Sequence, residues 1–173
     1  MKRAYIPKGQ RNDWCTPGDV LDVVRDAFGG SIDLDPCSNP ASITMAAREI
    51  WETDYPEASR KDSVEIGNGL ALVWHGRTFV NPPFDNLGAW IQKCAQEGRP
   101  RRAEVILLCP SRTDTIAWQA LAPTVDALCF WKGRIKFLGS LYGAPFPTAL
   151  LYWGTNPSMF ARAFRPKGII FKP

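Results

Sequence analysis

Amphipathic segments of helical period and short, continuous apolar runs follow one another along the chain, and the two patterns predict different elements. Apolar residues spaced three and four apart indicate helices, which are expected at about 17–28, 85–97, 115–121 and 158–164. Thr16 is the expected N-cap of the first helix and Pro17 its first residue, and Gly29-Gly30 follows its last turn. Asp85 is the expected cap of the second helix.

The short apolar runs predict strands at 31–36, 77–80, 104–109, 127–131, 134–138, 148–153 and 168–171. The run 104–109 is apolar throughout, as in a parallel sheet that is covered on both faces. Residues 127–138 are expected to form a hairpin around Lys132-Gly133. Residues 41–69 are expected to be irregular and mobile, ordering over a ligand, with an insert at about 52–68.

These elements predict an α/β fold with a mainly parallel sheet and an antiparallel carboxy-terminal hairpin. With 173 residues and 45% hydrophobic content, the chain can bury one core, so a basic arm (1–13) and a single domain (14–173) are expected. The five cysteines have neither a paired spacing nor a matching histidine pattern, so no metal site is expected. No membrane span or signal peptide is apparent, and a reducing cytoplasm is the expected compartment.

The segment Arg77-Thr78-Phe79-Val80-Asn81-Pro82-Pro83-Phe84 carries the strongest chemical signal. The two prolines cannot donate ladder hydrogen bonds, so the strand must end at Asn81, and their fixed φ presets the direction of nearby carbonyls. The Asn81 side-chain oxygen and the Pro82 carbonyl can together accept both hydrogens of one exocyclic amine, and Phe84 can stack on its ring. The tetrapeptide matches a signature of amino-group methyltransferases that use S-adenosylmethionine.

Other residues suit the binding of such a methyl donor. Asp35 lies at the carboxyl end of the first predicted strand, where a nucleotide-like cofactor meets an open α/β sheet, and can accept from an α-amino group. The N-terminus of the first helix can hold a carboxylate, or can be an ordinary capped end. Asn68 can bond an adenine or simply form an Asn-Gly turn. No G-x-G-x-x-G loop is present.

Basic residues near the predicted strand ends can contact a polyanion, and the net charge of +4 is compatible with one. Lys132, Arg134 and Lys136 can contact a DNA backbone or belong to a solvated hairpin. Arg112 can organise a phosphate or stabilise a helix cap.

Taken in order, several segments resemble the phage-type DNA N6-adenine methyltransferases of the Dam family. They are Trp14-Cys15-Thr16-Pro17, Asp33-Leu34-Asp35-Pro36-Cys37, Asn68-Gly69-Leu70, Phe79-Val80-Asn81-Pro82-Pro83-Phe84, Arg112-Thr113-Asp114-Thr115, Gly133-Arg134-Ile135-Lys136-Phe137 and Ala144-Pro145-Phe146-Pro147. The resemblance implies a Rossmann-like class I methyltransferase fold, S-adenosylmethionine as donor and adenine in double-stranded DNA as acceptor.

By the same resemblance, Asn81, Pro82, Pro83 and Phe84 form the catalytic turn. The residues expected around the cofactor are Trp14, Thr16, Pro17, Asp33, Asp35, Pro36, Cys37 and Asn68. Phe84 stands where the family more often has Tyr.

Four alternatives remain open from the sequence. Pro36-Cys37 is the dipeptide of cytosine-C5 methyltransferases. The Asn-Pro-Pro-aromatic turn also occurs in enzymes that methylate guanine N2 in RNA or glutamine in release factors, although these carry a glycine-rich loop. Cytosine N4 is a further acceptor for the same chemistry. Finally, the chain can be a catalytically inactive DNA-binding module.

Overall fold

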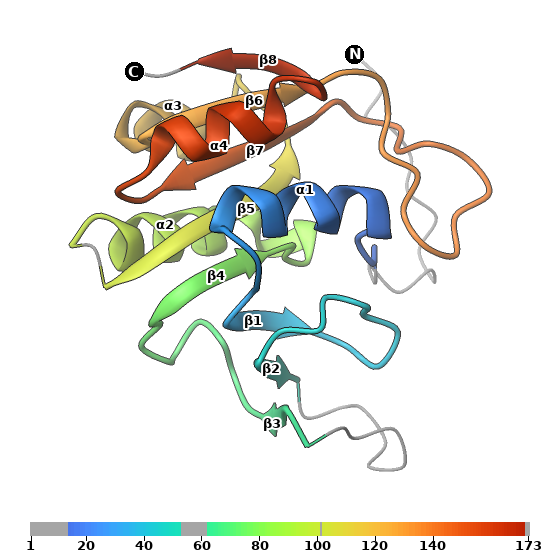
Figure 1. Cartoon of the computed structure of the whole chain (residues 1–173), viewed down its shortest axis with the longest axis vertical. Helices are drawn as coiled ribbons and strands as arrows, with labels where there is room; N and C mark the ends of the chain where they lie inside the picture. The colour runs from blue at the N-terminus through green and yellow to red at the C-terminus, as the bar shows by residue number, and fades with distance from the viewer. Residues whose placement is uncertain (1–13, 53–61, 101, 172–173) are drawn as a thin grey trace.

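The computed structural model of the chain describes residues 14–52, 62–100 and 102–171. Its centre is an eight-stranded sheet with the order β3-β2-β1-β4-β5-β7-β6-β8 (Figure 1). The strands are β1 (Leu34–Ser38), β2 (Arg48–Trp51), β3 (Val64–Ile66), β4 (Gly76–Val80), β5 (Ala103–Pro110), β6 (Ala127–Trp131), β7 (Thr148–Trp153) and β8 (Gly168–Phe171). Neighbours are parallel from β3 to β5, whereas β7 is antiparallel to β5 and β6, and β8 is antiparallel to β6. The strand order reverses between β1 and β4, where open α/β sheets bind ligands.

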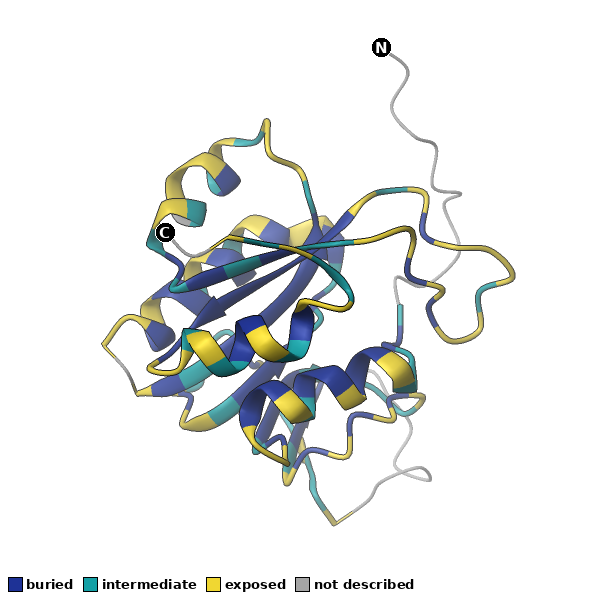
Figure 2. Ribbon diagram, turned by 45° about the horizontal axis from the view of Figure 1, so that its top comes forward, coloured by how far each residue is buried: buried dark blue, intermediate teal, exposed yellow. Residues whose placement is uncertain are grey.

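Helices cover both faces of this sheet. They are α1 (Gly18–Phe28), α2 (Leu87–Gly98), α3 (Ile116–Leu121) and α4 (Pro157–Phe164), with short 3-10 turns at Phe84–Asn86 and Ala122–Thr124. The helices α1 and α4 pack together on one face, and α2 and α3 on the other. In Figure 2 the helices are buried where they face the sheet and exposed on the outside.

The strand β5 shows why its sequence is apolar throughout. Ile106 and Leu108 belong to the hydrophobic cluster under α1 and α4, whereas Val105 and Leu107 belong to the cluster under α2 and α3. Both faces of the strand are therefore buried. The predicted α/β class with a mainly parallel sheet is confirmed.

The ends of two elements also follow the sequence. The strand β4 ends at Val80, directly before the Asn81-Pro82-Pro83 turn. The helix α1 ends at Gly29, which has φ of 79° and whose N–H group bonds the Asp26 carbonyl. A residue with a Cβ rarely adopts this left-handed conformation.

The expected hairpin at 127–138 is wrong. The strand β6 pairs with β7 on one edge and β8 on the other, so neither edge is free for residues 134–138. After Gly133, which has φ of 80°, the chain leaves the sheet. Ile135 and Phe137 are buried in the core instead of lying in a strand. The antiparallel carboxy-terminal part of the sheet is thus built from β6, β7 and β8.

The expectation of irregular structure at 41–69 is also wrong in part. The strands β2 and β3 both fall within it and extend the parallel sheet beyond β1. Residues 53–61 of the predicted insert, and the predicted arm at 1–13, lie outside the described residues.

Candidate active site

A cavity of about 320 Å³ opens beyond the carboxyl ends of β1 and β4. Eight of the residues expected at a site line it: Trp14, Thr16, Asp35, Pro36, Cys37, Asn68, Asn81 and Pro83. Pro17, Pro82, Phe84 and Asp33 are not part of this lining. The fold therefore brings together expected residues that are up to 69 positions apart in the sequence, from Trp14 to Pro83.

The side-chain amide of Asn81 is held in one orientation by the segment that precedes α1. Its Nδ2 group donates to Thr16 Oγ1 at 3.0 Å and to the Trp14 carbonyl. The other atom of the amide, Oδ1, is buried and accepts no hydrogen bond from the described residues. Leaving a buried acceptor unpaired costs about 1–3 kcal/mol, which a ligand N–H group would recover.

The hydroxyl of Thr16 has a different role from the one expected. Thr16 is not the N-cap of α1: the cap position is Pro17, with extended backbone and no capping side chain. The Thr16 hydroxyl accepts from Asn81 instead. Asp85 likewise lies in the 3-10 turn Phe84–Asn86 and not at the cap of α2, and it lines the cavity.

Phe84 is buried among aromatic rings rather than open to the cavity. Its ring centroid lies 5.2 Å from that of Phe146 and 6.4 Å from that of Phe137, both in edge contacts. Trp14 meets the same two rings at 6.0 and 5.3 Å. The Asn81-Pro82-Pro83-Phe84 turn thus contacts residues 132–147, which connect β6 to β7, through a cluster of four aromatic side chains.

Asp35 is the second residue of β1, and its carboxyl group is buried. Its Oδ1 accepts from the Cys37 N–H group at 3.2 Å, and Glu49 of β2 lies beside it in the sheet register. Burial, with a smaller contribution from the Glu49 charge, raises the pKa of Asp35 to about 6, and hydrogen bonds from Thr44 and Cys37 only partly oppose this. A bound cation would favour the ionised form of such a group.

Asp33 directly precedes β1 and does not line the cavity. Its carboxylate accepts from the Arg77 Nη2 at 2.7 Å, from Nε at 2.9 Å and from the backbone N–H group at 2.8 Å. These hydrogen bonds lower the pKa of Asp33. The contacts fix the start of β1 against the start of β4, which is a structural role.

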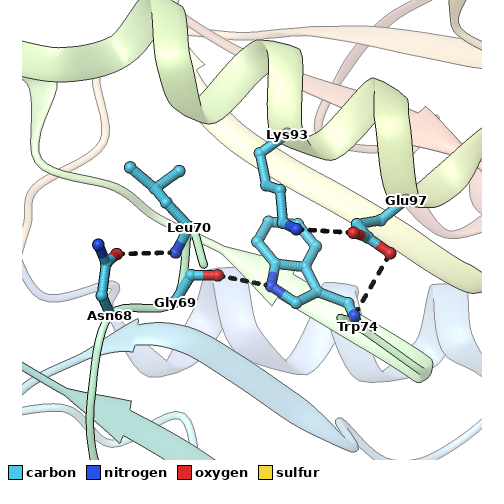
Figure 3. Close-up of polar contacts among 6 residues, drawn as sticks. All are labelled: Asn68, Gly69, Leu70, Trp74, Lys93 and Glu97. Atoms are coloured by element: carbon cyan, nitrogen blue, oxygen red, sulfur yellow. Dashed lines mark hydrogen bonds and ion pairs between the residues drawn. The ribbon is translucent and has the colours of Figure 1, made fainter. Parts of the chain in front are cut away.

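Asn68 and Gly69, which form a turn drawn in Figure 3, both line the cavity. Asn68 Oδ1 accepts from the Leu70 N–H group at 3.0 Å, so the expected Asn-Gly turn is present, and the residue also lines the cavity. A Cβ on Gly69 would lie 1.8 Å from the Pro36 carbonyl oxygen. Only glycine allows this approach of the turn to β1.

A buried polar cluster supports this turn from behind (Figure 3). The fully buried Trp74 donates from its indole Nε1 to the Gly69 carbonyl at 2.9 Å. Its backbone N–H group donates to Glu97 Oε2 at 3.3 Å, and Lys93 bonds the other oxygen of Glu97 at 2.7 Å. The turn is therefore held by α2 as well as by β1.

The cavity lining contains three carboxylates and no basic side chain among the described residues. The carboxylates belong to Asp35, Glu52 and Asp85. Such a lining favours a ligand with positive charge and disfavours a phosphate. S-adenosylmethionine carries a sulfonium and an ammonium group, so the donor set fits it.

Several lining residues were not expected from the sequence, and the main ones are Asn39, Ser42, Thr44, Glu52 and Asp85. Glu52 directly follows β2, so an acidic residue at a strand end was the available signal. The sequence does not predict this role because no strand is expected at Arg48–Trp51.

The basic residues expected at DNA are exposed and lie outside the cavity lining. Arg112 follows β5, and Lys132, Arg134 and Lys136 follow β6. Because β7 is antiparallel to both β5 and β6, the strands β5 and β6 run in the same direction. Their carboxyl ends therefore lie on the same side of the sheet as the cavity, which opens beyond the carboxyl ends of β1 and β4. None of the four forms an ion pair with a described residue.

Comparison with known protein families decides the class of the molecule. A family model described as DNA N-6-adenine-methyltransferase (Dam) matches residues 3–145. The chain belongs to the Dam family. The resemblance found in the sequence is thereby confirmed, and the chain is an adenine-specific DNA methyltransferase of that family. The expected phage or prophage origin stays a prediction.

Among solved structures, the Dam-family chain is similar to the precorrin-6y C5,15-methyltransferase from Geobacter metallireducens GS-15. The two have 16% sequence identity and a TM-score of 0.49, and the similarity covers 87% of this chain and 94% of that one. No curated protein matches the sequence.

The family match and the site chemistry both argue against the cytosine-C5 alternative. Burial, assisted by the charge of Asp35, raises the pKa of the Cys37 thiol well above its ordinary value. A nucleophilic cysteine requires the opposite shift.

Two further features of the Dam-family chain concern metals and membranes. In the described ranges, no group of three or more His, Cys, Asp and Glu side chains is placed to hold a metal ion. Within the same ranges, no helix has the length and apolar character needed to cross a membrane.

Proposed function

We propose that this Dam-family protein transfers a methyl group from S-adenosylmethionine to N6 of an adenine that is flipped out of duplex DNA into the Asn81-Pro82-Pro83-Phe84 turn. The observation that carries the proposal is the state of the Asn81 amide. Its NH2 group is bound by Thr16 and Trp14, so its buried oxygen is left to accept from a ligand. An adenine amine supplies such a donor.

The cavity beside this turn is proposed to hold the methyl donor, which supplies an electrophilic methyl group on a sulfonium. The Asp35 carboxylate would pair with its ammonium group, and Glu52 would accept from the ribose hydroxyl groups. Asn68 would contact the adenine ring of S-adenosylmethionine. Trp14, Thr16, Pro36 and Cys37 would surround the methionine part, as the lining suggests.

In the proposed mechanism, Asn81 Oδ1 and the Pro82 carbonyl accept the two hydrogens of the adenine amine. Both acceptors favour a nitrogen with a localised lone pair, and they stabilise the positive charge that develops as the N–C bond forms and the C–S bond breaks. The nitrogen then loses a proton to solvent. Since a stacked base is out of reach, the adenine must leave the duplex first.

Product identification tests this proposal. The protein is incubated with labelled S-adenosylmethionine and unmethylated duplex DNA, RNA and protein acceptors in parallel, and the nucleosides of the DNA are separated. The label is expected in N6-methyladenine. Label in N4-methylcytosine, or only in RNA or protein, would overturn the acceptor. Absence of label from every acceptor would favour the inactive DNA-binding module.

A further inference from the structure

The segment 132–147, which connects β6 to β7, carries two neighbouring apolar side chains that face solvent. Leu141 and Tyr142 are 82% and 79% exposed. Figure 1 shows the segment as a loop that extends away from the sheet beside the first residues of α1. Contiguous apolar surface held in solvent is a candidate binding surface.

The two legs of this loop are fastened together below the exposed pair. The Ala144 N–H group donates to the Ile135 carbonyl at 2.8 Å. A Cβ on Gly143 would lie 2.8 Å from the Cβ of Arg134, so the legs touch there as well. The buried side chains of Ile135 and Ala144 anchor both legs in the core. These contacts close the base of the loop, which we call the neck and which consists of residues 134–138 and 143–146. Leu141 and Tyr142 lie beyond it.

The neck is in direct contact with the proposed catalytic turn. Phe137 packs on Trp14 and Phe84, and Phe146 of the other leg packs on the same two rings. The Leu138 N–H group donates to the Cys15 carbonyl at 2.9 Å. A DNA duplex placed with one adenine at Asn81 would therefore lie against the loop.

The charge of the loop fits a polyanion. Residues 132–147 include three basic side chains and no carboxylate, and Lys132, Arg134 and Lys136 are all exposed. Basic side chains contact phosphates, whereas apolar side chains on the same loop can enter between bases.

We propose that Leu141 and Tyr142 enter the duplex beside the target adenine and occupy the space that the flipped base leaves. This inference rests on the proposed function. It makes the two side chains of this loop the wedge, that is, the apolar side chains that enter the base stack when the adenine leaves it. Tyr142 would stack on a neighbouring base and Leu141 would fill the gap, so that part of the lost stacking is replaced.

The test compares two duplexes that contain the methylated site, mapped beforehand from the labelled product. In one the target adenine is paired with thymine, and in the other it faces an abasic position, so that flipping costs less. Leu141→Ala/Tyr142→Ala is expected to lower kcat/KM on the paired duplex roughly 10- to 100-fold, given the contribution of base stacking. On the abasic duplex the loss should shrink to about threefold or less, because the wedge has less to replace.

The controls separate this role from folding and from a general surface effect. Tyr142→Phe should retain activity, since it keeps the ring. Ile169→Ala removes another exposed apolar side chain, which lies on β8 and is 66% exposed. This variant should have the wild-type kcat/KM on both duplexes. Affinity for S-adenosylmethionine and thermal unfolding should be unchanged in the double variant.

The outcomes distinguish this inference from the function on which it rests. A double variant that methylates the paired duplex as fast as wild type, or that loses equally on both duplexes, would overturn the wedge alone. A wild-type protein that methylates neither duplex would overturn the proposed function and the wedge together.

Discussion

At the scale of single residues, the site depends on which atom of an amide is already bound. Asn81 makes two hydrogen bonds through its nitrogen, to Thr16 and to the backbone of Trp14, and this fixes the position of its oxygen. Both partners precede α1, more than 60 positions away. A catalytic acceptor is more effective when it does not have to reorient during the reaction.

Asp35 differs from Asn81 because burial makes its ionised carboxylate unfavourable until a cationic ligand binds beside it. Its folded-state pKa of about 6 is above the ordinary value, so the stability that it contributes is fully present at low pH. That contribution is lost as the pH rises from the ordinary pKa through about 6. The cofactor-free protein should therefore carry an unfavourable buried charge at neutral pH.

Asp35→Asn should remove this effect. At pH 7.5 the cofactor-free variant is expected to be about 2–3 kcal/mol more stable than wild type, and the difference should vanish near pH 4. Urea unfolding at several pH values measures it. The same variant should bind S-adenosylmethionine more weakly, because the partner of the ammonium group is lost. A variant that is destabilised equally at all pH values would contradict the proposed charge state.

At the scale of elements, the shape of the cavity depends on close packing between a turn and a strand end. Gly69→Ala should push the turn 67–70 away from Pro36, because the added Cβ would meet the Pro36 carbonyl. Since backbone must move, a loss of stability of about 1–3 kcal/mol is expected, together with weaker cofactor binding.

Gly67→Ala is the matched control for this prediction. A Cβ on Gly67 would meet only Ile50 at an ordinary 3.8 Å. Denaturant unfolding and cofactor titration of the two variants are compared. Equal behaviour of the two would mean that the approach of Gly69 to β1 does not shape the site.

Elements with local sequence signals were predictable, and those that depend on distant partners were not. The proline pair ends β4 and Gly29 ends α1 through their own backbone geometry. By contrast, β2 contains Glu49, which is fully buried and accepts from the Ser38 hydroxyl of β1 at 2.8 Å. A charged residue in a four-residue run does not suggest a buried strand, and its partner is not visible locally.

The same distinction applies to the site. Asn81 and Asp35 could be found because their types and their positions at the carboxyl ends of predicted strands carry chemical meaning, and Asn68 because it belongs to an Asn-Gly pair that also resembles the family pattern. The roles of Thr16 and Phe84 could not, since each depends on a contact made by folding. The sequence predicts a hairpin at 127–138 because a glycine stands between two apolar runs, whereas in the fold both edges of β6 are occupied by β7 and β8.

At the scale of the whole molecule, the cavity, Arg112 and the 132–147 loop all lie at the carboxyl ends of the strands β1, β4, β5 and β6. The basic residues there would contact phosphates, which makes binding dependent on salt. Arg134→Ala and Lys136→Ala should each reduce the slope of log K against log salt for duplex DNA by about 0.9. The affinity of the cofactor should be unaffected.

Arg102→Ala provides the comparison, because Arg102 is exposed at the start of β5, at the opposite edge of the sheet. Its slope should equal that of wild type. If all three variants lowered the slope equally, DNA would be held by overall charge and not by this edge.

The most direct test of the account is the single-turnover rate of methyl transfer by Asn81→Ala, measured together with its affinity for S-adenosylmethionine. Loss of a group that stabilises the transition state should lower the rate about 100-fold or more, while cofactor affinity changes by no more than about threefold. Asn86→Ala, which removes an exposed asparagine one turn later, should transfer at the wild-type rate. A rate for Asn81→Ala within a few fold of wild type would contradict the assignment of this turn as the catalytic centre.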